Sequence, residues 1–360
     1  MGKIKVCHLT SAHDKEDDRI FLKECVSLAD NGYEVYLVEC GDSYVKSGVN
    51  IVGVGQAPEG RLKRMTGFSK TVFKKALELD CDIYHFHDPE LLQYGLKLKK
   101  AGKKVIFDSH EDVPAQIMDK EWIPSFLRKM VSGMYRNYET KVAGKIDCVI
   151  TATSHIEEQF KGRAARTLVV NNYPKLDDIT FHEGSFADRD AVVCYAGGIN
   201  ELRGEKTMIK AMEKVDGKLI MAGDHEICDV GDKVHYTGKL DRAGVNDLYG
   251  KSVAGLCILK PIENYFYSQP IKMYEYMAAG IPFVCSDFPG WKVVAEESGA
   301  GICVESENCD MIADAINQLL SDREKAQEMG RSGHEYVITK CTWKNEEKNL
   351  LELYSSLTGK

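Results

Sequence analysis

The sequence lacks paired cysteines, long apolar runs and an excess of basic residues. Its 12 cysteines are scattered singly among 360 residues, without a Cys-x-x-Cys pair or a His/Cys cluster at zinc-finger spacing. Neither a disulfide framework nor a structural metal site is therefore indicated. No apolar run approaches the roughly 20 residues of a membrane span, and the first run is too short for a signal peptide. We expect a cytoplasmic protein.

The net charge of −8 argues against general nucleic-acid binding, which requires a basic face to neutralise phosphates. Two stretches nevertheless run against this acidic average. Residues 61–75 carry six basic side chains and no acid, and residues 120–145 mix six basic residues with Trp122, Phe126, Met130 and Met134. Both patterns are typical of basic amphipathic helices, with the apolar side either in the core or against an anionic membrane. A membrane contact would place the protein peripherally on the inner face of the plasma membrane.

Short apolar runs alternate with longer helical patterns along the whole chain, which predicts α/β architecture with parallel sheets. A first series of strands is expected at Ile4–Leu9, Val35–Val38, Ile51–Val54, Ile83–Phe86, Val105–Phe107 and Val149–Thr151. A second series is expected at Val192–Ala196, Leu219–Ala222, Val234–Tyr236, Gly255–Leu259, Phe283–Cys285 and Ile302–Val304.

The two series predict two domains. The segment Asn171-Asn-Tyr-Pro174 separates them, because proline disfavours helix in the residue before it. We expect an N-terminal domain over residues 1–175, a C-terminal domain over residues 176–340, and a helix within residues 341–360 that packs back on the first domain.

Open parallel sheets bind ligands at the carboxyl ends of their strands, and polar residues gather there in both halves. In the first half, His87 and Asp88 follow one strand, while Asp108 and His110 follow the next. In the second half, Gly197 and Gly198 follow the first strand, as expected where backbone amides and a helix start meet a phosphate.

The most informative stretch is Ser268-Gln-Pro-Ile-Lys272-Met-Tyr-Glu275, at the start of a predicted helix. Proline suits a first helical turn, and Ser268 or Gln269 is placed to cap it. A cation such as Lys272 is disfavoured there unless an anion binds nearby. Lys272 and Glu275 then form either a clamp for the diphosphate and ribose of a nucleotide or an ordinary surface pair. Spacing alone does not decide between these interpretations.

Ordered motifs over nearly the whole chain resemble the retaining family 4 type of GT-B glycosyltransferase, in which two Rossmann-like domains face each other across a cleft. The donor-domain motifs are Ser268-x-Pro-x-Lys272-x-x-Glu275, Gly197-x-x-x-x-x-Arg203-Gly204, Ala222-Gly-Asp224 and Thr237-Gly-Lys239. Those of the first domain, Ser11-Ala-His with Asp18-Arg19, His87-Asp88-Pro89 and Asp108-Ser-His110, look like a bacterial surface-polysaccharide subgroup.

The resemblance implies a role for each matching residue. It assigns Glu275 to the ribose, and Arg203, Lys272 and the helix-start amides to the diphosphate. It places the base near Lys239 and Leu240, His110 beside the transferred sugar with His87 and Asp88 as neighbours, and Arg19 facing the cleft. The remaining donor-site positions are Gly197, Gly198, Gly223, Ser268, Gln269, Pro270 and Ile271.

The expected activity is retaining transfer of a hexose from a nucleotide-diphosphate sugar to a hydroxyl of a glycan or lipid-linked acceptor. Capsule, exopolysaccharide or lipopolysaccharide synthesis would use such a reaction, with no metal required and no cofactor besides the donor substrate. An inverting enzyme would instead need a base, for which Asp88 or His87 is available. A GT-B nucleotide-sugar epimerase and a non-catalytic nucleotide-sugar-binding partner protein are the alternatives.

Two departures from the family pattern bear on the donor site. Tyr267 stands eight positions before Glu275, where the family often has a first glutamate, and Gly198 replaces a common arginine. The nucleotide base, the sugar and the acceptor are left open by the sequence.

Overall fold

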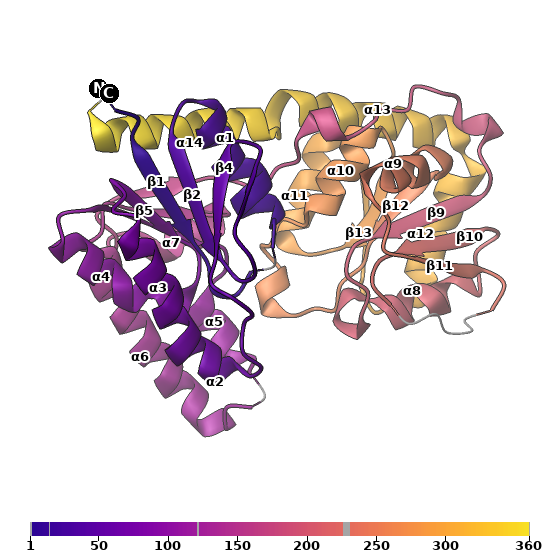
Figure 1. The fold of residues 1–360 in the computed structure, drawn as a ribbon. Helices are drawn as coiled ribbons and strands as arrows, with labels where there is room; N and C mark the ends of the chain where they lie inside the picture. Colours follow the sequence, from indigo (N-terminus) through magenta and orange to yellow (C-terminus); the bar gives the residue numbers. More distant parts are fainter. Residues whose placement is uncertain (1, 14, 121, 226–230, 360) are drawn as a thin grey trace. The chain divides into compact units, whose positions relative to one another are not determined.

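The chain folds into two compact units in a computed structural model, which describes residues 2–13, 15–120, 122–225 and 231–359. Unit 1 comprises Met1–Asn172 with Glu346–Lys360, and unit 2 comprises Tyr173–Asn345. In Figure 1 each unit contains its own sheet flanked by helices, and the yellow C-terminal helix belongs mostly to unit 1. The predicted α/β class is confirmed.

The sheet of unit 1 has the strand order β3-β4-β2-β1-β5-β6-β7-β8, and all neighbours are parallel except the pair β3–β4. Its strands are β1 (Lys5–Leu9), β2 (Glu34–Glu39), β3 (Tyr44–Lys46), β4 (Val49–Gly53), β5 (Ile83–Phe86), β6 (Lys104–Ser109), β7 (Cys148–Thr151) and β8 (Thr167–Val169).

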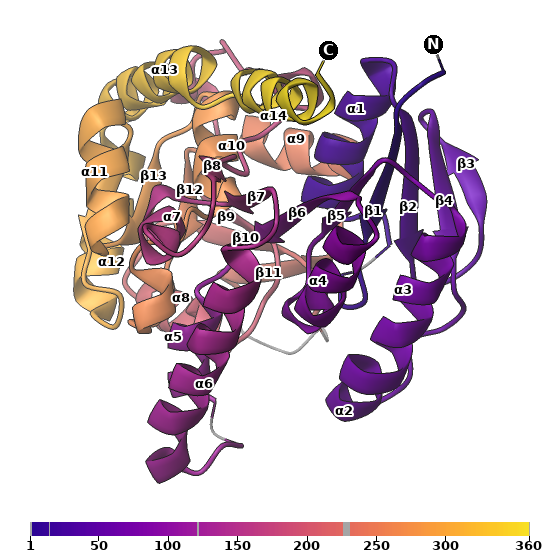
Figure 2. The same cartoon turned by 90° about the vertical axis from the view of Figure 1, so that its left-hand side faces the viewer.

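The connections of unit 1 are mainly helical, and Figure 2 shows α3, α4 and α6 along one side of the strands. The helices are the π-helix η1 (Asp18–Cys25), α1 (Val26–Asp30), α2 (Arg61–Lys63), the π-helix η2 (Arg64–Phe68), α3 (Ser69–Glu78), the 3₁₀ turn η3 (Pro89–Leu91), α4 (Leu92–Lys100), α5 (Val113–Met118), α6 (Ser125–Ala143), α7 (Ser154–Phe160) and α14 (Trp343–Thr358).

Unit 2 contains a six-stranded parallel sheet in the order β11-β10-β9-β12-β13-β14. Its strands are β9 (Val192–Ala196), β10 (Lys218–Ala222), β11 (Val234–Gly238), β12 (Ala254–Cys257), β13 (Phe283–Ser286) and β14 (Gly301–Val304). Its helices are the 3₁₀ turns η4 (Leu176–Asp178), η5 (Phe186–Asp188), η6 (Glu201–Arg203) and η7 (Glu263–Tyr265), with α8 (Glu205–Met212), α9 (Arg242–Lys251), α10 (Ile271–Ala279), α11 (Pro289–Ser298), α12 (Cys309–Ser321) and α13 (Arg323–Lys340).

Each apolar run predicted as a strand overlaps a strand of the structure. The short apolar runs therefore predicted the type of these elements correctly. The sequence missed the short strands β3 and β8. A helix follows β1, and the Asp17 carboxylate accepts hydrogen bonds from the amides of Arg19 and Ile20 at its start. Its first eight residues wind as a π-helix, which the apolar periodicity did not indicate.

The two faces of the unit 1 sheet carry different side chains at its centre. Cys7, Tyr84 and Phe86 point into the apolar core that Val72 and Leu92 complete. Because successive side chains of a strand alternate between faces, His8 and His85 lie on the opposite face, and the strand register places them directly side by side. Buried histidines therefore lie at the centre of the face opposite this core.

The two basic stretches fold differently from each other. In residues 61–75, the apolar side chains of α3 enter the core, as expected for a solvated helix with one buried face. In α6, by contrast, Phe126, Met130 and Met134 remain exposed. Among the residues that the structure describes, no helix combines the length and the apolar character that a membrane crossing requires.

Candidate functional site

The centre of the unit 2 sheet is a topological switch point. The chain leaves β9 toward β10 on one side and leaves β12 toward β13 on the other. The segments after β9 and β12 therefore diverge at the carboxyl edge, where open α/β sheets bind ligands. The glycines Gly197 and Gly198 follow β9, and helix α10 follows β12.

Backbone segments approach closely at this edge. The amide of Gly197 donates to Ala222 O at 2.9 Å, and the amide of Gly223 donates to Gly238 O at 3.0 Å. A Cβ atom at Gly223 would lie 2.1 Å from Gly197 O, so a side chain is excluded there. Gly197 has a φ of +135°, in the range that favours glycine. Two of the predicted donor-site glycines, Gly197 and Gly223, thus have steric reasons for their identity.

The first turn of α10 is not capped as the sequence suggested. Pro270 occupies the N-cap position, and no side chain accepts a hydrogen bond from the helix amides. The Ser268 hydroxyl instead donates to Tyr265 O at 3.0 Å, while Trp291 Nε1 donates to Ser268 O at 2.7 Å. The capping expectation for Ser268 and Gln269 is therefore wrong, because the preceding loop turns the serine away from the helix.

Lys272 is buried in the first turn of α10. Only 7% of it is exposed, and its ammonium Nζ has no hydrogen-bond partner in the part of the chain that the structure describes. Nζ lies 3.5 Å from the centre of the Tyr195 ring. Burial is the main cause that lowers the pKa of Lys272 to about 8, and the nearby charge of Arg203 adds to it. An unpaired buried cation is unfavourable unless a ligand supplies the missing negative charge.

Two cationic side chains flank the glycine loop. A Cβ atom at Gly197 would lie 3.1 Å from Lys272 Nζ, and one at Gly198 would lie 3.3 Å from Arg203 Nη1. The loop is exposed on its other side, as is Arg203 itself. Gly198, which replaces the common arginine of the family, therefore leaves room for the guanidinium of Arg203. Two cations therefore lie beside the glycine loop, an arrangement that can bind an anion.

Glu275 lies one turn beyond Lys272 and is 9% exposed, so the pair is not a surface ion pair. Its Oε1 accepts a hydrogen bond from Arg242 Nη1 at 2.8 Å, and its Oε2 accepts one from Tyr249 Oη at 2.9 Å. A carboxylate has about four lone-pair positions, so these two bonds leave room for further donors. Sequence reasoning missed Arg242 and Tyr249, which hold this carboxylate in place.

The positions expected near a nucleotide base lie at the end of β11. Gly238 has a φ of +72°, and the exposed Lys239 and half-buried Leu240 follow it directly. The Asp241 carboxylate then accepts a hydrogen bond from the amide of Gly244 and begins helix α9. Arg242 stands in the first turn of that helix, so Lys239, Leu240 and the partner of Glu275 belong to one short segment.

In unit 1, Asp108 is the centre of a buried charged network. Arg19 Nε and Nη2 donate to its two oxygens at 2.8 and 2.9 Å, and Arg19 Nη1 donates to Val170 O at 2.7 Å. Burial alone would raise the pKa of Asp108, but Arg19 and His110 hold it well below its usual range. Arg19 is 3% exposed. The expectation that it presents its charge to a cleft is wrong, because Asp108 and Val170 O together bind the buried guanidinium.

His110 is the accessible member of this network. Its Nε2 lies 2.9 Å from Asp108 Oδ2 and 3.4 Å from His87 Nδ1, and 19% of its side chain is exposed. His87 itself is 2% exposed, and burial lowers its pKa to about 4. Of the two predicted histidines, only His110 therefore reaches the surface of unit 1.

Asp88 is 1% exposed and already accepts several hydrogen bonds. Thr10 Oγ1 donates to it at 2.9 Å, the Ser11 amide donates at 2.5 Å, and His13 Nδ1 lies 3.0 Å from Oδ1. Burial would raise its pKa, but these contacts, chiefly the one with His13, lower it to about 2. A carboxylate so placed accepts a proton poorly, which disfavours the predicted role of Asp88 as a base.

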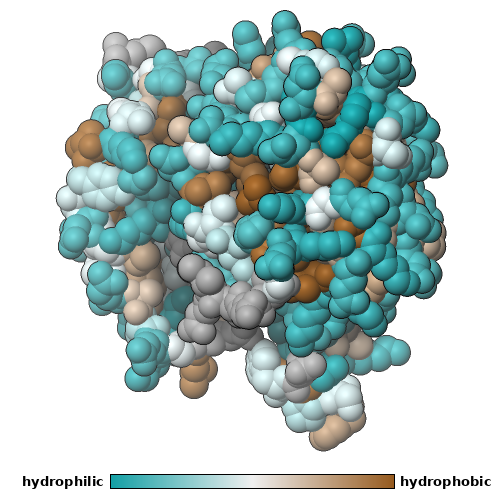
Figure 3. All heavy atoms as spheres, turned by 90° about the vertical axis from the view of Figure 1, so that its right-hand side faces the viewer, coloured by the Kyte–Doolittle hydropathy of each residue, from teal (hydrophilic) through white to brown (hydrophobic). Residues whose placement is uncertain are grey.

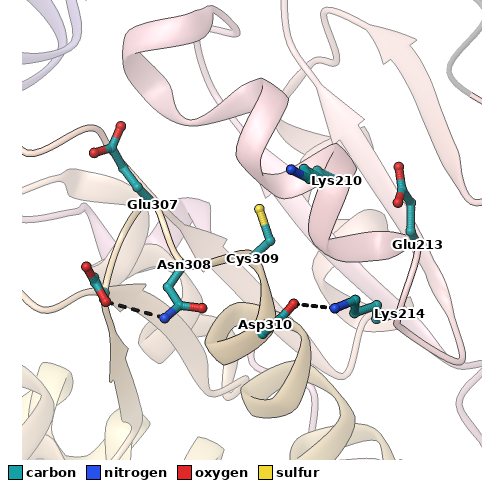
Figure 4. Close-up of a pocket in the computed structure, with 8 residues that line it drawn as sticks. Lys210, Glu213, Lys214, Glu307, Asn308, Cys309 and Asp310 are labelled. Atoms are coloured by element: carbon teal, nitrogen blue, oxygen red, sulfur yellow. Dashed lines mark hydrogen bonds and ion pairs between the residues drawn. The ribbon is translucent and has the colours of Figure 1, made fainter.

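A separate groove of about 510 Å³ lies between α8 and the start of α12. Figure 4 shows Lys210, Glu213 and Lys214 on one side of it and Glu307 to Asp310 on the other. Its closest contact is the exposed pair of Lys214 and Asp310 at 2.6 Å. None of the predicted site residues lines this groove.

Two glycosyltransferase family models match the chain, one in each half. The model described as Glycosyl transferases group 1 matches residues 177–336, and the model described as Glycosyltransferase Family 4 matches residues 21–172. The first covers the glycine loop, Lys272 and Glu275, and the second covers His87, Asp108 and His110. The chain belongs to the group 1 glycosyltransferases of the GT-B fold.

Curated relatives of this glycosyltransferase are distant. It is 23% identical over 241 residues to spore coat protein SA of Bacillus subtilis, with 57% of this chain and 64% of that protein covered. It is 22% identical over 358 residues to the phosphatidyl-myo-inositol mannosyltransferase of Mycolicibacterium smegmatis, with 92% of this chain and 88% of that protein covered. The match to the first relative spans less than two thirds of that protein's length.

Solved structures show the fold more clearly than the sequence matches do. The sucrose-phosphate synthase of Thermosynechococcus elongatus has a TM-score of 0.79 at 17% identity, with 99% of this chain and 100% of that chain covered. Anabaena Alr3699/HepE in complex with UDP has a TM-score of 0.73 at 13% identity, with 99% of this chain and 100% of that chain covered. Both confirm the GT-B architecture of two Rossmann-like domains.

Proposed function

We propose that this group 1 glycosyltransferase moves a hexose from a nucleotide-diphosphate sugar to a hydroxyl of a glycan or lipid-linked acceptor. The carrying observation is the buried ammonium of Lys272, which has no hydrogen-bond partner among the residues that the structure describes and lies beside the exposed glycine loop. A diphosphate supplies the negative charge that this buried ammonium needs as a partner, and it is large enough to reach the loop as well. The solved structure of Anabaena Alr3699/HepE with UDP supports a donor of this kind.

The roles in donor binding follow from position in unit 2. Lys272, Arg203 and the amide of Gly198 bind the diphosphate, Gly197 keeps the loop free of a side chain beside it, and the ribose hydroxyls donate to the free lone pairs of Glu275. The base lies near Lys239 and Leu240. Ser268, Gln269, Pro270 and Ile271 line the approach to the first turn of α10, where Gln269 Oε1 is buried without a hydrogen-bond partner among the described residues.

We propose retaining transfer without a required metal at the diphosphate. Two cations and oriented amides stabilise the negative charge that develops on the leaving diphosphate, which is the term that a metal ion supplies in other transferases. The acceptor proton passes to the departing phosphate. His110, held by Asp108, orients hydroxyls of the transferred sugar rather than removing a proton.

The function is tested with a panel of UDP, GDP, ADP and CDP and their common sugars. A nucleotide present at 100 times its Kd stabilises the folded state by about 2.7 kcal/mol, which a thermal-shift measurement detects. The stabilising donor is then incubated with lipid-linked acceptors. Product formation that requires an acceptor supports transfer, whereas rapid epimerisation of the donor without any acceptor would contradict it. Nucleotide binding with no transfer to any acceptor would favour a binding protein.

Replacement of Glu275 by glutamine is expected to weaken binding of both the nucleoside and the nucleoside diphosphate by about 10- to 100-fold. The charge that accepts the ribose hydroxyls is lost, and hydrogen bonds to a charged group contribute about 1.5–3 kcal/mol. Glutamine keeps an acceptor for Tyr249 and nearly the same volume, so the core stays filled. Isothermal titration calorimetry measures both affinities. Glu213→Gln, at an exposed position after α8, is the control and should bind as the wild type does.

An unchanged affinity of Glu275→Gln for the nucleoside would remove Glu275 from the ribose site. A loss confined to the diphosphate would instead place Glu275 beside the phosphates.

We further propose a peripheral contact with an anionic membrane, which presents the lipid-linked acceptor on the cytoplasmic face in polysaccharide synthesis. Helix α6 carries a stripe with i, i+4 spacing, in which Phe126, Met130 and Met134 are 81%, 55% and 65% exposed. Figures 1 and 2 show α6 projecting past α4 and α5. Figure 3 shows the molecule from the right-hand side of Figure 1, and this face is mainly hydrophilic with smaller hydrophobic areas. Exposed apolar groups beside lysines fit a membrane surface.

Membrane recruitment is expected to fall in a Lys129→Gln, Lys141→Gln, Lys145→Gln variant. These lysines are exposed and lie on α6, which carries the apolar stripe, or directly after it. Each lysine near an anionic surface contributes about 1 kcal/mol, so the triple change should lower vesicle binding by about 100-fold. Flotation with anionic liposomes measures it. A control with Lys218, Lys251 and Lys344 changed to glutamine has the same net charge, and equal flotation of the two variants would contradict the proposal.

A further inference from the structure

Four side chains of types that can ligate a metal ion meet inside unit 1, on the face of its sheet that carries His8 and His85. His8 lies on β1, His85 lies beside it on β5, His87 follows two residues later on the same face, and Glu24 comes from η1. The side chains of all four have an exposed fraction of 0%. The proposed sugar transfer gives none of His8, Glu24 and His85 a role.

The candidate ligand atoms lie within about 0.7 Å of the separations that a small tetrahedral ion requires. His8 Nδ1 is 3.0 Å from His87 Nε2. Glu24 Oε2 is 3.8 Å from His8 Nδ1, 3.7 Å from His85 Nδ1 and 4.0 Å from His87 Nε2. Metal–ligand bonds of about 2.0–2.2 Å in a tetrahedron place the ligand atoms about 3.3–3.5 Å apart. The observed distances lie on both sides of this value.

The carboxylate of Glu24 supplies the second, independent observation. Neither of its oxygens has a hydrogen-bond partner in the part of the chain that the structure describes, and Arg19 Nε, 3.2 Å from Oε1, is its ion-pair contact. His85 Nε2 also has no hydrogen-bond partner among the described residues, whereas His85 Nδ1, the nitrogen that faces Glu24, lies 2.8 Å from the hydroxyl of Tyr354, which zinc binding would displace from that nitrogen. A buried carboxylate without hydrogen bonds is strongly unfavourable, and a cation between Oε2 and the three rings would satisfy it.

Further side chains hold the ligands in the orientation that metal sites use. His87 Nδ1, the ring nitrogen that points away from the cluster, lies 3.3 Å from Asp108 Oδ2. His8 Nε2 lies 3.1 Å from the hydroxyl of Tyr354 on α14. Metal-binding histidines generally donate their second ring N–H to such an oxygen, which fixes the tautomer and the ring plane.

We propose that His8, Glu24, His85 and His87 bind one zinc ion as a closed, structural site. Three imidazole nitrogens and one carboxylate oxygen in a tetrahedral set suit zinc, whereas magnesium and calcium prefer oxygen ligands. Four protein ligands leave no position for substrate, so the ion fastens β1, β5 and η1 together. Through His87, it also fixes the neighbourhood of Asp108 and His110.

A second group of His87, Asp108 and His110 is the weaker candidate. It offers three ligand atoms, and both oxygens of Asp108 are already bound by Arg19. We therefore assign the ion to the four-residue group.

The metal content of the wild-type protein is the first test. The full chain is purified from zinc-replete cells without a metal-chelating column. Inductively coupled plasma mass spectrometry should then find about one zinc per chain. Removal of the metal with a chelator should lower the Tm by about 5 °C or more, and Zn²⁺ alone should restore it. Co²⁺ in its place should give the visible absorption of a tetrahedral nitrogen and oxygen site.

Two variants locate the ion. Glu24→Gln and His8→Gln should retain less than about a tenth of the zinc, because each removes one of four ligands. Glu39→Gln is the matched control, since Glu39 is a carboxyl of the same sheet that is 1% exposed and lies outside the cluster. It should keep its zinc in full.

Metal-free wild-type protein that takes up neither Zn²⁺ nor Co²⁺ and whose Tm does not change with a chelator would overturn the proposal. A full zinc content in both ligand variants would overturn it as well. The wild-type measurements decide the question even where a variant does not fold.

Discussion

Replacement of Lys272 by methionine is expected to weaken binding of a nucleoside diphosphate by about 100-fold and to change binding of the bare nucleoside little. Charge-assisted hydrogen bonds to phosphate contribute about 1.5–3 kcal/mol, and every 1.4 kcal/mol is a factor of ten in affinity. Arg203 and the amides of the glycine loop remain, so binding is weakened rather than abolished. Calorimetric titration with both ligands measures the two effects.

The same substitution is expected to stabilise the ligand-free protein. Burial lowers the pKa of Lys272 from 10.5 to about 8, which corresponds to about 3 kcal/mol of unfavourable free energy at neutral pH. Methionine fills a similar volume without a charge. A higher Tm together with a weaker diphosphate affinity is therefore the expected combination, and it separates a functional lysine from one that merely fills the core.

The pH dependence provides a further check on Lys272. Its folded pKa lies below its unfolded value, so the cost of burying the charge is fully present below pH 8 and is relieved as pH rises toward 10.5. Stability from this group therefore rises in that window, whereas diphosphate affinity falls about tenfold per pH unit above 8, because the ammonium must be charged to bind. The charged and titratable groups that affect the pKa of Lys272 are Arg203, Glu275, Cys257 and Cys194.

Calorimetry in buffers of different ionisation enthalpy should detect proton uptake on diphosphate binding above pH 8 in the wild type. Lys272→Met should lack this uptake. Lys292→Met is the control, since Lys292 is 47% exposed and pairs with Asp287 on the surface. Equal losses of nucleoside and nucleoside-diphosphate affinity in Lys272→Met would move this lysine away from the diphosphate.

The strands were predictable because a fully buried parallel strand reads as a short apolar run between polar segments. The strands β3 and β8 lack this pattern and were not predicted. Tyr44–Lys46 is a three-residue edge strand with exposed Val45 and Lys46, and Thr167–Val169 is only half-buried. Short edge strands need little apolar surface, so their formation depends on the neighbouring strand rather than on their own pattern.

The proposed donor site was partly predictable, because a cation in a first helical turn suggests a bound anion. That argument identified Lys272, but only its burial excluded a surface pair with Glu275. The same argument applies to Arg242 in the first turn of α9. The sequence did not connect Arg242 with Glu275, since the two are 33 positions apart and meet only through the packing of α9 and α10.

The histidine cluster shows the limit of local patterns more clearly. Alternation along β5 places His85 and His87 on one face, which the sequence allows one to infer. The contact with His8 depends on β1 being the neighbour of β5, and Glu24 reaches the cluster from a π-helix. Strand order and helix winding arise from tertiary packing, so ligands separated by up to 79 positions carry no recognisable spacing.

Replacement of Gly330 by alanine is expected to destabilise unit 2 by about 3 kcal/mol, although alanine normally favours a helix over glycine by about 1 kcal/mol. Gly330 lies within α13, and a Cβ atom there would be 2.0 Å from Gly280 O and 2.8 Å from Gly280 C. These are backbone atoms at the C-terminus of α10, where Gly280 has a φ of +78°. They cannot move without displacing the helix that carries Lys272 and Glu275, so the steric term outweighs the helix propensity.

Gly133→Ala provides the matched control, because Gly133 is also inside a helix but has no atom within 4 Å of its would-be Cβ. That variant should gain about 0.5–1 kcal/mol. For a unit of this size, each kcal/mol shifts the Tm by about 2–4 °C, so calorimetry should find Gly330→Ala lower by about 6–12 °C and Gly133→Ala slightly higher. Equal stabilisation of both variants would mean that α10 and α13 are not packed backbone to backbone. Since Gly280 ends the helix that begins beside the glycine loop, the same displacement should also weaken nucleotide binding at the other end of α10.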